Sequence, residues 1–233
     1  MNKRDVIVAC DFKDKDTTLR FLELFDRDEK PFVKIGMELF YSEGPDIVKA
    51  LRAKGHDIFL DLKLHDIPNT VKSAMKVISR LDVQITNIHA STDEMMKEAL
   101  EGLRENDSKT LLITVTILTS TGSESLKKEL LIDYSLDDVI KKYALRAFNA
   151  GLDGVVCSPK ETALVKETCG SSFIIVTPGI RYPDSLADDQ SRVTTPKEAG
   201  EIGCDYIVVG RPITRAKDPI SAYRKVRKEF LGG

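Results

Sequence analysis

The sequence predicts an α/β protein with the (β/α)8 TIM-barrel fold, formed as a single domain by residues 1–233. Eight short apolar runs rich in β-branched residues alternate with longer amphipathic stretches, which is typical of parallel strands joined by helical crossovers. The runs are almost continuously apolar, as in sheets buried on both faces. Eight such units in 233 residues fit a compact barrel, and an open doubly wound sheet is the second choice.

Strands are predicted where apolar residues follow one another without interruption, at residues 6–10, 32–35, 58–62, 85–89, 111–117, 154–157, 173–177 and 206–209. Helices are predicted where apolar residues recur every three or four positions, at residues 46–54, 71–81, 93–104, 136–150, 195–202 and 220–230. Residues 120–135 and 179–194 are irregular, and both stretches follow strands, where barrels carry functional loops. No linker-like or low-complexity segment divides the chain, which indicates one domain.

The composition excludes several classes of protein. A net charge of −2 provides no general attraction to nucleic acid or to an anionic membrane, so an anionic ligand must be held by local positive groups. The four cysteines lack CxxC or CxxH spacing, which argues against a structural zinc site. No apolar stretch is long enough to span a membrane, and the N-terminal segment shows no cleavage pattern. A reducing cytoplasm is the expected compartment.

Polar and charged residues gather where the predicted strands end, which is the face on which barrels place their active sites. Only Ser158 follows the sixth strand. At the ends of the other strands stand Asp11, Lys34, Asp61, Lys63, His89, Thr119, Ser120, Pro178, Gly179, Gly210 and Arg211. This concentration on one rim predicts an enzyme.

Asp61 and Lys63 are expected to point into the barrel mouth. Side chains alternate along a strand, so these two share one face and the leucines between and beside them take the other. Lys34 on the neighbouring strand extends the group. The alternative interpretation is a structural ion pair that closes the barrel end, since charge clusters also occur in structural networks.

The residues after this strand allow two interpretations. Asp66 precedes Ile67, Pro68 and a helical pattern, so capping of that helix and catalysis are both open for it. Thr70 lies four residues further on and is able to share its face. The roles of His65 and His89 also stay open, because no HxxxH spacing indicates a metal pair.

The stretch IVVGRPIT at residues 207–214 predicts a phosphate site. Gly210 allows a backbone amide to approach a ligand, and Arg211 supplies a forked donor. The loop after the eighth strand of a barrel commonly binds phosphate. VTPGIR at residues 176–181 adds a second glycine next to a cation, Arg181. The alternative is a surface arginine beside a turn.

Taken in order, these stretches resemble the orotidine 5′-phosphate decarboxylase family, in its bacterial branch, over nearly the whole chain. The resemblance is carried by ACDF (9–12), VKIGMELF (33–40), DLKLHDIPNTV (61–71), TILTSTG (116–122), GLDGVVCS (151–158), VTPGIR, DDQSR (188–192) and IVVGRPIT. The resemblance implies decarboxylation of orotidine 5′-monophosphate to uridine 5′-monophosphate, with no cofactor and no metal.

The resemblance also implies residue roles. Lys63 is the proton donor to C6 of the pyrimidine, and Asp61 lies against the substrate carboxylate. Lys34 and Asp11 hold ribose hydroxyls and complete the charged group. The remaining substrate contacts are assigned to Thr119 and Ser120 at the ring, to Pro178, and to Arg181, Gln190, Gly210 and Arg211 at the phosphate.

In this family the acid of the HDIP segment and the threonine of the PNT segment reach into the site of a partner subunit. The resemblance therefore implies a homodimer in which Asp66 and Thr70 act across the interface.

Two other functions are weighed against this one. A magnesium-dependent sugar-phosphate lyase of the same suprafamily shares the Asp-x-Lys-x-x-Asp arrangement, but the intact HDIPNT continuation and the pairing of Gln190 with Arg211 argue against it. A non-catalytic nucleotide-binding barrel would not need an ammonium against a carboxylate, so the pair of Asp61 and Lys63 argues against that function.

Overall fold

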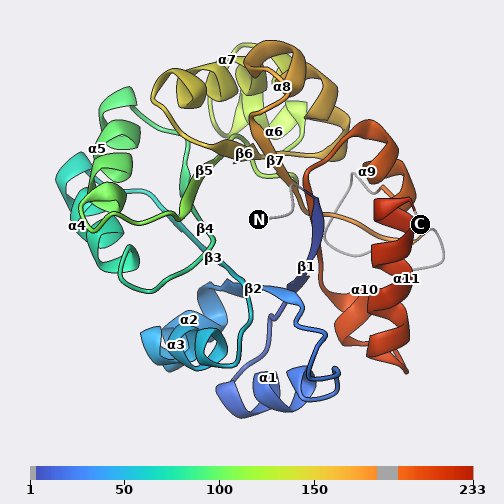
Figure 1. Cartoon of the computed structure of the whole chain (residues 1–233). Helices are drawn as coiled ribbons and strands as arrows, with labels where there is room; N and C mark the ends of the chain where they lie inside the picture. Colours follow the sequence, from blue (N-terminus) through green and yellow to red (C-terminus); the bar gives the residue numbers. More distant parts are fainter. Residues whose placement is uncertain (1–3, 183–193, 233) are drawn as a thin grey trace.

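A computed structural model of the chain describes residues 4–182 and 194–232. In this part of the chain eight parallel strands close into a barrel, each strand pairing with the next and β8 with β1. A ring of helices surrounds them (Figure 1). The strands are β1 (Asp5–Ala9), β2 (Phe32–Gly36), β3 (Ile58–Leu64), β4 (Ile85–His89), β5 (Leu111–Val115), β6 (Gly154–Val156), β7 (Ile174–Thr177) and β8 (Tyr206–Val209). The predicted barrel is confirmed, and the open sheet is excluded.

The six predicted helical segments are confirmed as α3 (Pro45–Ala53), α4 (Pro68–Ile78), α5 (Asp93–Arg104), α7 (Leu136–Asn149), α9 (Pro196–Ile202) and α11 (Pro219–Leu231). Further helices were not predicted: α1 (Lys15–Leu22), α2 (Met37–Glu43), α6 (Ser123–Lys128), the 3-10 turn η1 (Pro159–Glu161), α8 (Thr162–Cys169) and α10 (Arg211–Thr214). These elements are all short, so few apolar repeats mark them. The helix α6 lies inside the stretch that was predicted to be irregular.

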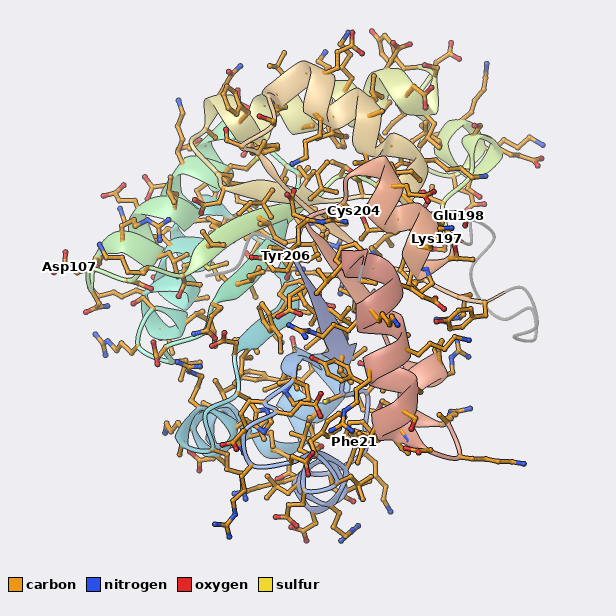
Figure 2. All side chains as sticks on the ribbon, turned by 45° about the vertical axis from the view of Figure 1, so that its right-hand side comes forward. Phe21, Asp107, Lys197, Glu198, Cys204 and Tyr206 are labelled. Carbon is orange, nitrogen blue, oxygen red and sulfur yellow. The ribbon has the colours of Figure 1, made fainter. Side chains whose placement is uncertain are left out.

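The core has two layers. Inside the barrel, apolar side chains from the strands fill the space, among them Phe32, Phe59 and Tyr206. Tyr206 lies near the middle of the molecule in Figure 2, whereas Asp107 lies at its outer edge. The outer layer is a continuous cluster between strands and helices. Because the barrel interior is packed, open space for a ligand is left at the strand ends.

The last helix, α11, ties the C-terminal part of the chain to the barrel. It packs against β1, α9 and α10, as Figure 1 shows at the right of the molecule. Its buried side is formed by Tyr223, Val226 and Phe230. No helix in the described ranges is long and apolar enough to cross a membrane.

Candidate active site

A cavity of about 340 Å³ opens at the carboxyl ends of the strands. Its walls are contributed by β1, β2, β3, β5, β6, β7 and β8 and by the segments that follow several of these strands. Of the residues selected from the sequence, the cavity is lined by Asp11, Lys34, Asp61, Lys63, Thr119, Pro178, Gly179, Arg181, Gly210 and Arg211. The barrel topology therefore collects into one space residues that are up to 200 positions apart in the chain.

Asp11, Lys34, Asp61 and Lys63 form one connected group, which we call the charged array. Lys34 Nζ lies 2.8 Å from Asp11 Oδ1 and 3.5 Å from Asp61 Oδ2. Lys63 Nζ lies 2.6 Å from Asp61 Oδ1. Asp61, which lines the cavity, is thus held between two ammonium groups, as the positions of these residues on adjacent strands predicted.

Strand β3 reaches this geometry through an irregularity that simple alternation does not predict. Its pairing with β4 shifts in register between Leu60 and Leu64. Lys63, inside the shifted part, has a φ of 52°, which is the left-handed region that non-glycine residues rarely adopt. The expectation that Asp61 and Lys63 share the barrel mouth is correct, although the strand that carries them is not regular.

Asn87 is a polar residue of the site that the sequence did not single out. It is buried on β4, and its amide donates to Asp61 Oδ1 at 2.7 Å. Its carbonyl oxygen accepts from the Lys63 backbone N–H at 2.8 Å. Asn87 therefore binds both the carboxylate and the irregular backbone of β3. One feature of the sequence could have indicated it. Asn87 lies two residues before His89 and therefore shares the inward face of the same strand.

Electrostatics keep Asp61 and Lys34 ionised. Burial by itself raises the pKa of Asp61. The charges of Lys34 and Lys63, together with hydrogen bonds from Lys63 and Asn87, lower it by more than burial raises it, so the net shift is downward. Burial lowers the pKa of Lys34, but Asp61 and Asp11 raise it more, so its net shift is upward. A carboxylate and an ammonium group consequently face the cavity as charges at neutral pH.

Two arginines also line the cavity, one after β7 and one after β8. Arg181 follows β7 and the turn at Gly179, whose φ of 83° suits glycine. Gly210 and Arg211 follow β8, and Arg211 is the first residue of α10. Two guanidinium groups and a glycine backbone at one end of the cavity suit a phosphate group.

Other predicted residues lie outside the cavity lining. Asp66, which follows β3, and Thr70, in the first turn of α4, are exposed, and Ser120 is exposed next to Thr119. Asp66 does not occupy the N-cap of α4, because that position belongs to Ile67, and its carboxylate accepts from the Ile67 backbone N–H at 2.7 Å. The helix-capping interpretation of Asp66 is therefore wrong. Gln190 lies outside the described residues.

The two histidines near the site form a pair. Their ring centroids are 5.8 Å apart, and His65 Nε2 lies 3.2 Å from Ser91 Oγ. Burial, followed by His65 and Lys63, lowers the pKa of His89. Across the described residues, no cluster of three or more His, Cys, Asp or Glu side chains is arranged to hold a metal ion. All four cysteines are free and buried.

The chain matches the family described as "Orotidine 5'-phosphate decarboxylase / HUMPS family" over residues 4–226. It is 49% identical over 226 residues to the orotidine 5'-phosphate decarboxylase of Staphylococcus aureus strain N315, covering 97% of each chain. The enzyme of the same name from Staphylococcus saprophyticus is 49% identical over 227 residues, covering 97% of this chain and 98% of the relative.

Two solved structures resemble the fold as a whole. One is orotidine 5'-phosphate decarboxylase from Lactobacillus acidophilus, at 41% identity with a TM-score of 0.87, covering 98% of this chain and 99% of the other. The second is an uncharacterized conserved protein from Geobacillus kaustophilus, at 45% identity with a TM-score of 0.84, covering 97% and 99%. By sequence and by fold, the chain belongs to the orotidine 5'-phosphate decarboxylase family.

Proposed function

We propose that this chain decarboxylates orotidine 5′-monophosphate to uridine 5′-monophosphate in pyrimidine nucleotide synthesis, without a cofactor. The observation that carries the proposal is the ammonium of Lys63, held 2.6 Å from Asp61 in a cavity that Arg181 and Arg211 also line. Close similarity to decarboxylases of this name over 97% of the chain supports the same function.

Lys63 supplies the charge and the proton that the reaction needs. The bond between C6 and the carboxylate breaks, carbon dioxide leaves, and the electron pair stays on C6. A positioned ammonium stabilises that developing charge and then donates its proton to form the C6–H bond. Lys63 is left neutral until it takes a proton from solvent.

Asp61 acts on the substrate carboxylate. Its lowered pKa keeps it charged, so the bound carboxylate faces a second negative group. This repulsion disfavours the bound substrate relative to the state in which carbon dioxide has left. Lys34, which contacts both Asp11 and Asp61, holds the array together, and Lys34 and Asp11 bind the ribose hydroxyls.

The remaining assigned residues bind the ring and the phosphate. Thr119 and Ser120 contact the pyrimidine, and Pro178 lies on the same wall as Arg181. The phosphate is held by Arg181, Gln190, Gly210 and Arg211. Binding energy from a phosphate far from C6 raises turnover when it is used to align the reacting group.

We further propose a homodimer in which Asp66 and Thr70 complete the site of the partner. Both are exposed shortly after the end of β3, and Ile67 between them is 66% exposed. In an isologous interface, Ile67 would be buried against the partner, and the polar side chains of Asp66 and Thr70 would reach the partner's site.

Subunit mixing tests the shared site. Lys63→Ala and Asp66→Ala chains are each expected to be nearly inactive alone. After unfolding and refolding together, half of the dimers are mixed and each has one intact site, so about a quarter of the parent activity returns. If Asp66 acts within its own chain, the mixture stays inactive.

The decarboxylase itself is tested by following the ultraviolet absorbance of orotidine 5′-monophosphate with the purified protein and EDTA. The parent is expected to convert the substrate, and Lys63→Ala to lose conversion. Lys49→Ala is the matched control, because Lys49 is an exposed lysine whose ion pair is with Asp46 on α3. Conversion that requires added magnesium would point to the metal-dependent lyase. Binding of the nucleotide without turnover would point to the non-catalytic barrel.

We also propose that residues 1–233 form one domain and that it works in the cytoplasm. The closed barrel spans the described chain from β1 to β8, and the four cysteines are free thiols. One protease-resistant fragment and recovery in the cytoplasmic fraction are the expected results. Cleavage into two stable fragments, or recovery elsewhere, would contradict them.

A further inference from the structure

The segment that carries Arg181 is held by backbone hydrogen bonds to Thr194 and by contacts of the next residue, Tyr182, with α11. Ile180, almost fully buried, forms an isolated parallel bridge with Thr194. The Arg181 backbone N–H donates to the Thr194 carbonyl at 3.1 Å. The Arg181 side chain lines the cavity, and its Nη1 donates to the Ile180 carbonyl at 3.1 Å.

The next residue, Tyr182, does not line the cavity and contacts helix α11 instead. Its hydroxyl donates to Glu229 Oε2 at 2.8 Å. The ammonium of Lys225 lies 4.5 Å from the centroid of its ring. Lys225 and Glu229 are one helical turn apart, and their charged groups lie 4.0 Å from each other. The helix therefore contacts the face of the phenol ring through Lys225 and its hydroxyl group through Glu229.

We propose that Tyr182 is a positioning residue for phosphate binding, which fixes Arg181 relative to Arg211 by attaching the segment after β7 to α11. This inference rests on the proposed function, because it assumes that the two arginines bind the substrate phosphate.

The connection runs through α11. This helix follows α10, the element that begins with Arg211, and it packs against both α10 and β1. Tyr182 therefore links the segment that carries one cavity arginine to the helix next to the other. A phosphate binds two arginines most tightly when their spacing is fixed before binding, because ordering a long side chain during binding costs free energy.

Tyr182 is partly buried and packs against the outer core cluster, but its contacts with Lys225 and Glu229 are separate from the buried contacts of α11. The buried contacts of α11 come from Tyr223, Val226 and Phe230, which are on its inner side. Lys225 and Glu229 contact the phenol group from the outer side of the helix, where their side chains are 62% and 30% exposed. Loss of the phenol contacts therefore leaves the helix in its place.

The test compares a substrate that has the phosphate with one that lacks it. The catalytic efficiency kcat/KM of Tyr182→Leu is measured for orotidine 5′-monophosphate and, at high enzyme concentration, for orotidine. A loss of roughly tenfold is expected for the nucleotide, and less than about twofold for the nucleoside. Tyr182→Phe, which keeps the ring over Lys225, is expected to lose less. Dissociation constants of uridine 5′-monophosphate and uridine provide the same comparison without turnover.

Two controls separate positioning from general damage. Tyr134→Leu makes the same chemical change at an exposed tyrosine in the segment between α6 and α7, and no loss is expected. Glu229→Leu is expected to reproduce the nucleotide-specific loss of Tyr182→Phe, because each change removes the same hydrogen bond. The double variant Tyr182→Phe/Glu229→Leu is therefore expected to lose no more activity than Glu229→Leu alone.

Each other outcome has a distinct meaning. Equal losses on nucleotide and nucleoside, or no loss on either, would overturn the role of Tyr182. An inactive parent that binds neither nucleotide would instead contradict the proposed function, so the two failures are distinguishable.

Discussion

The ammonium of Lys63 lies 2.6 Å from Oδ1 of Asp61, while the backbone of Lys63 adopts the left-handed conformation with a φ of 52°. This conformation costs a non-glycine residue about 1–2 kcal/mol. It persists because Asn87 accepts a hydrogen bond from the Lys63 N–H and donates one to the Asp61 carboxylate. Strain of this kind survives where surrounding contacts over-determine it, and here it aims the ammonium at the carboxylate.

The first prediction concerns Asn87→Ala. The change leaves the Lys63 N–H without its buried acceptor and removes one of the donors to Asp61 Oδ1, so the free energy of unfolding is expected to fall by about 1–3 kcal/mol. The turnover number is expected to fall by about tenfold or more, because the strained backbone of Lys63 relaxes. Denaturant unfolding and the absorbance assay measure the two effects.

Asn106→Ala is its control. The Asn106 amide donates to Ser79 Oγ at 2.7 Å, away from the cavity. This variant is expected to keep the parent turnover number. An Asn87→Ala enzyme with unchanged turnover would show that β3 holds its conformation without the amide.

The second prediction is a pH dependence of stability that arises at His56. This side chain is buried, with Nδ1 3.0 Å from the Pro31 carbonyl. Burial lowers the pKa of His56 below its ordinary 6.5, more than the hydrogen bond to Pro31 raises it, and Lys30 and Lys54 lower it further. The unfolded chain therefore binds a proton near pH 6.5 that the folded chain binds only at lower pH. The free energy of unfolding should fall as the pH decreases below about 6.5.

His56→Gln tests this sign. Glutamine takes up no proton, so the variant is expected to lose less stability than the parent between about pH 7.5 and 5.5. Some dependence remains in the variant, because the pKa of His89 is also lowered. Urea unfolding at a series of pH values gives both slopes, and equal slopes would remove His56 from the explanation.

The third prediction concerns the packing of α4 on α5. A Cβ atom at Gly102 would lie 2.2 Å from the carbonyl oxygen of Lys72, on the facing helix. Because backbone atoms block the space, Gly102→Ala is expected to lower the free energy of unfolding by about 1–3 kcal/mol, even though alanine favours helix. Thermal unfolding measures it. Lys97→Ala, an exposed change on the same helix, should stay within about 0.5 kcal/mol of the parent.

The fold could be predicted because each strand is an almost uninterrupted apolar run, and such runs are little affected by what lies around them. Two strand ends differ from the prediction. The strand β5 stops at Val115, two residues earlier than predicted, and β3 continues to Leu64, two residues further than predicted. The short helices were missed for lack of repeats. For α1 a local signal existed, since Asp14 accepts from the Thr17 N–H at 2.7 Å as a helix cap.

The charged residues of the site could be predicted because the topology of a barrel brings strand ends together whatever the details of packing. Asn87 could not, because a polar residue inside a strand has no distinctive pattern until its partners are known. The register shift of β3 depends on contacts with β4, and these are not local in sequence. Asp66 and Thr70 are exposed, and the role proposed for them depends on a second chain, which no pattern within one chain reveals.

The last prediction separates binding from catalysis at Asp61. In Asp61→Asn the negative charge between Lys34 and Lys63 is lost, while the shape of the side chain is kept. If Asp61 repels the substrate carboxylate, turnover is expected to fall by about 100-fold or more while KM stays level or decreases, because strain in the bound state is relieved. Asp57→Asn, which weakens an ion pair with Arg52 before β3, should leave both constants unchanged. A higher KM with normal turnover would mean that Asp61 serves only to bind the substrate.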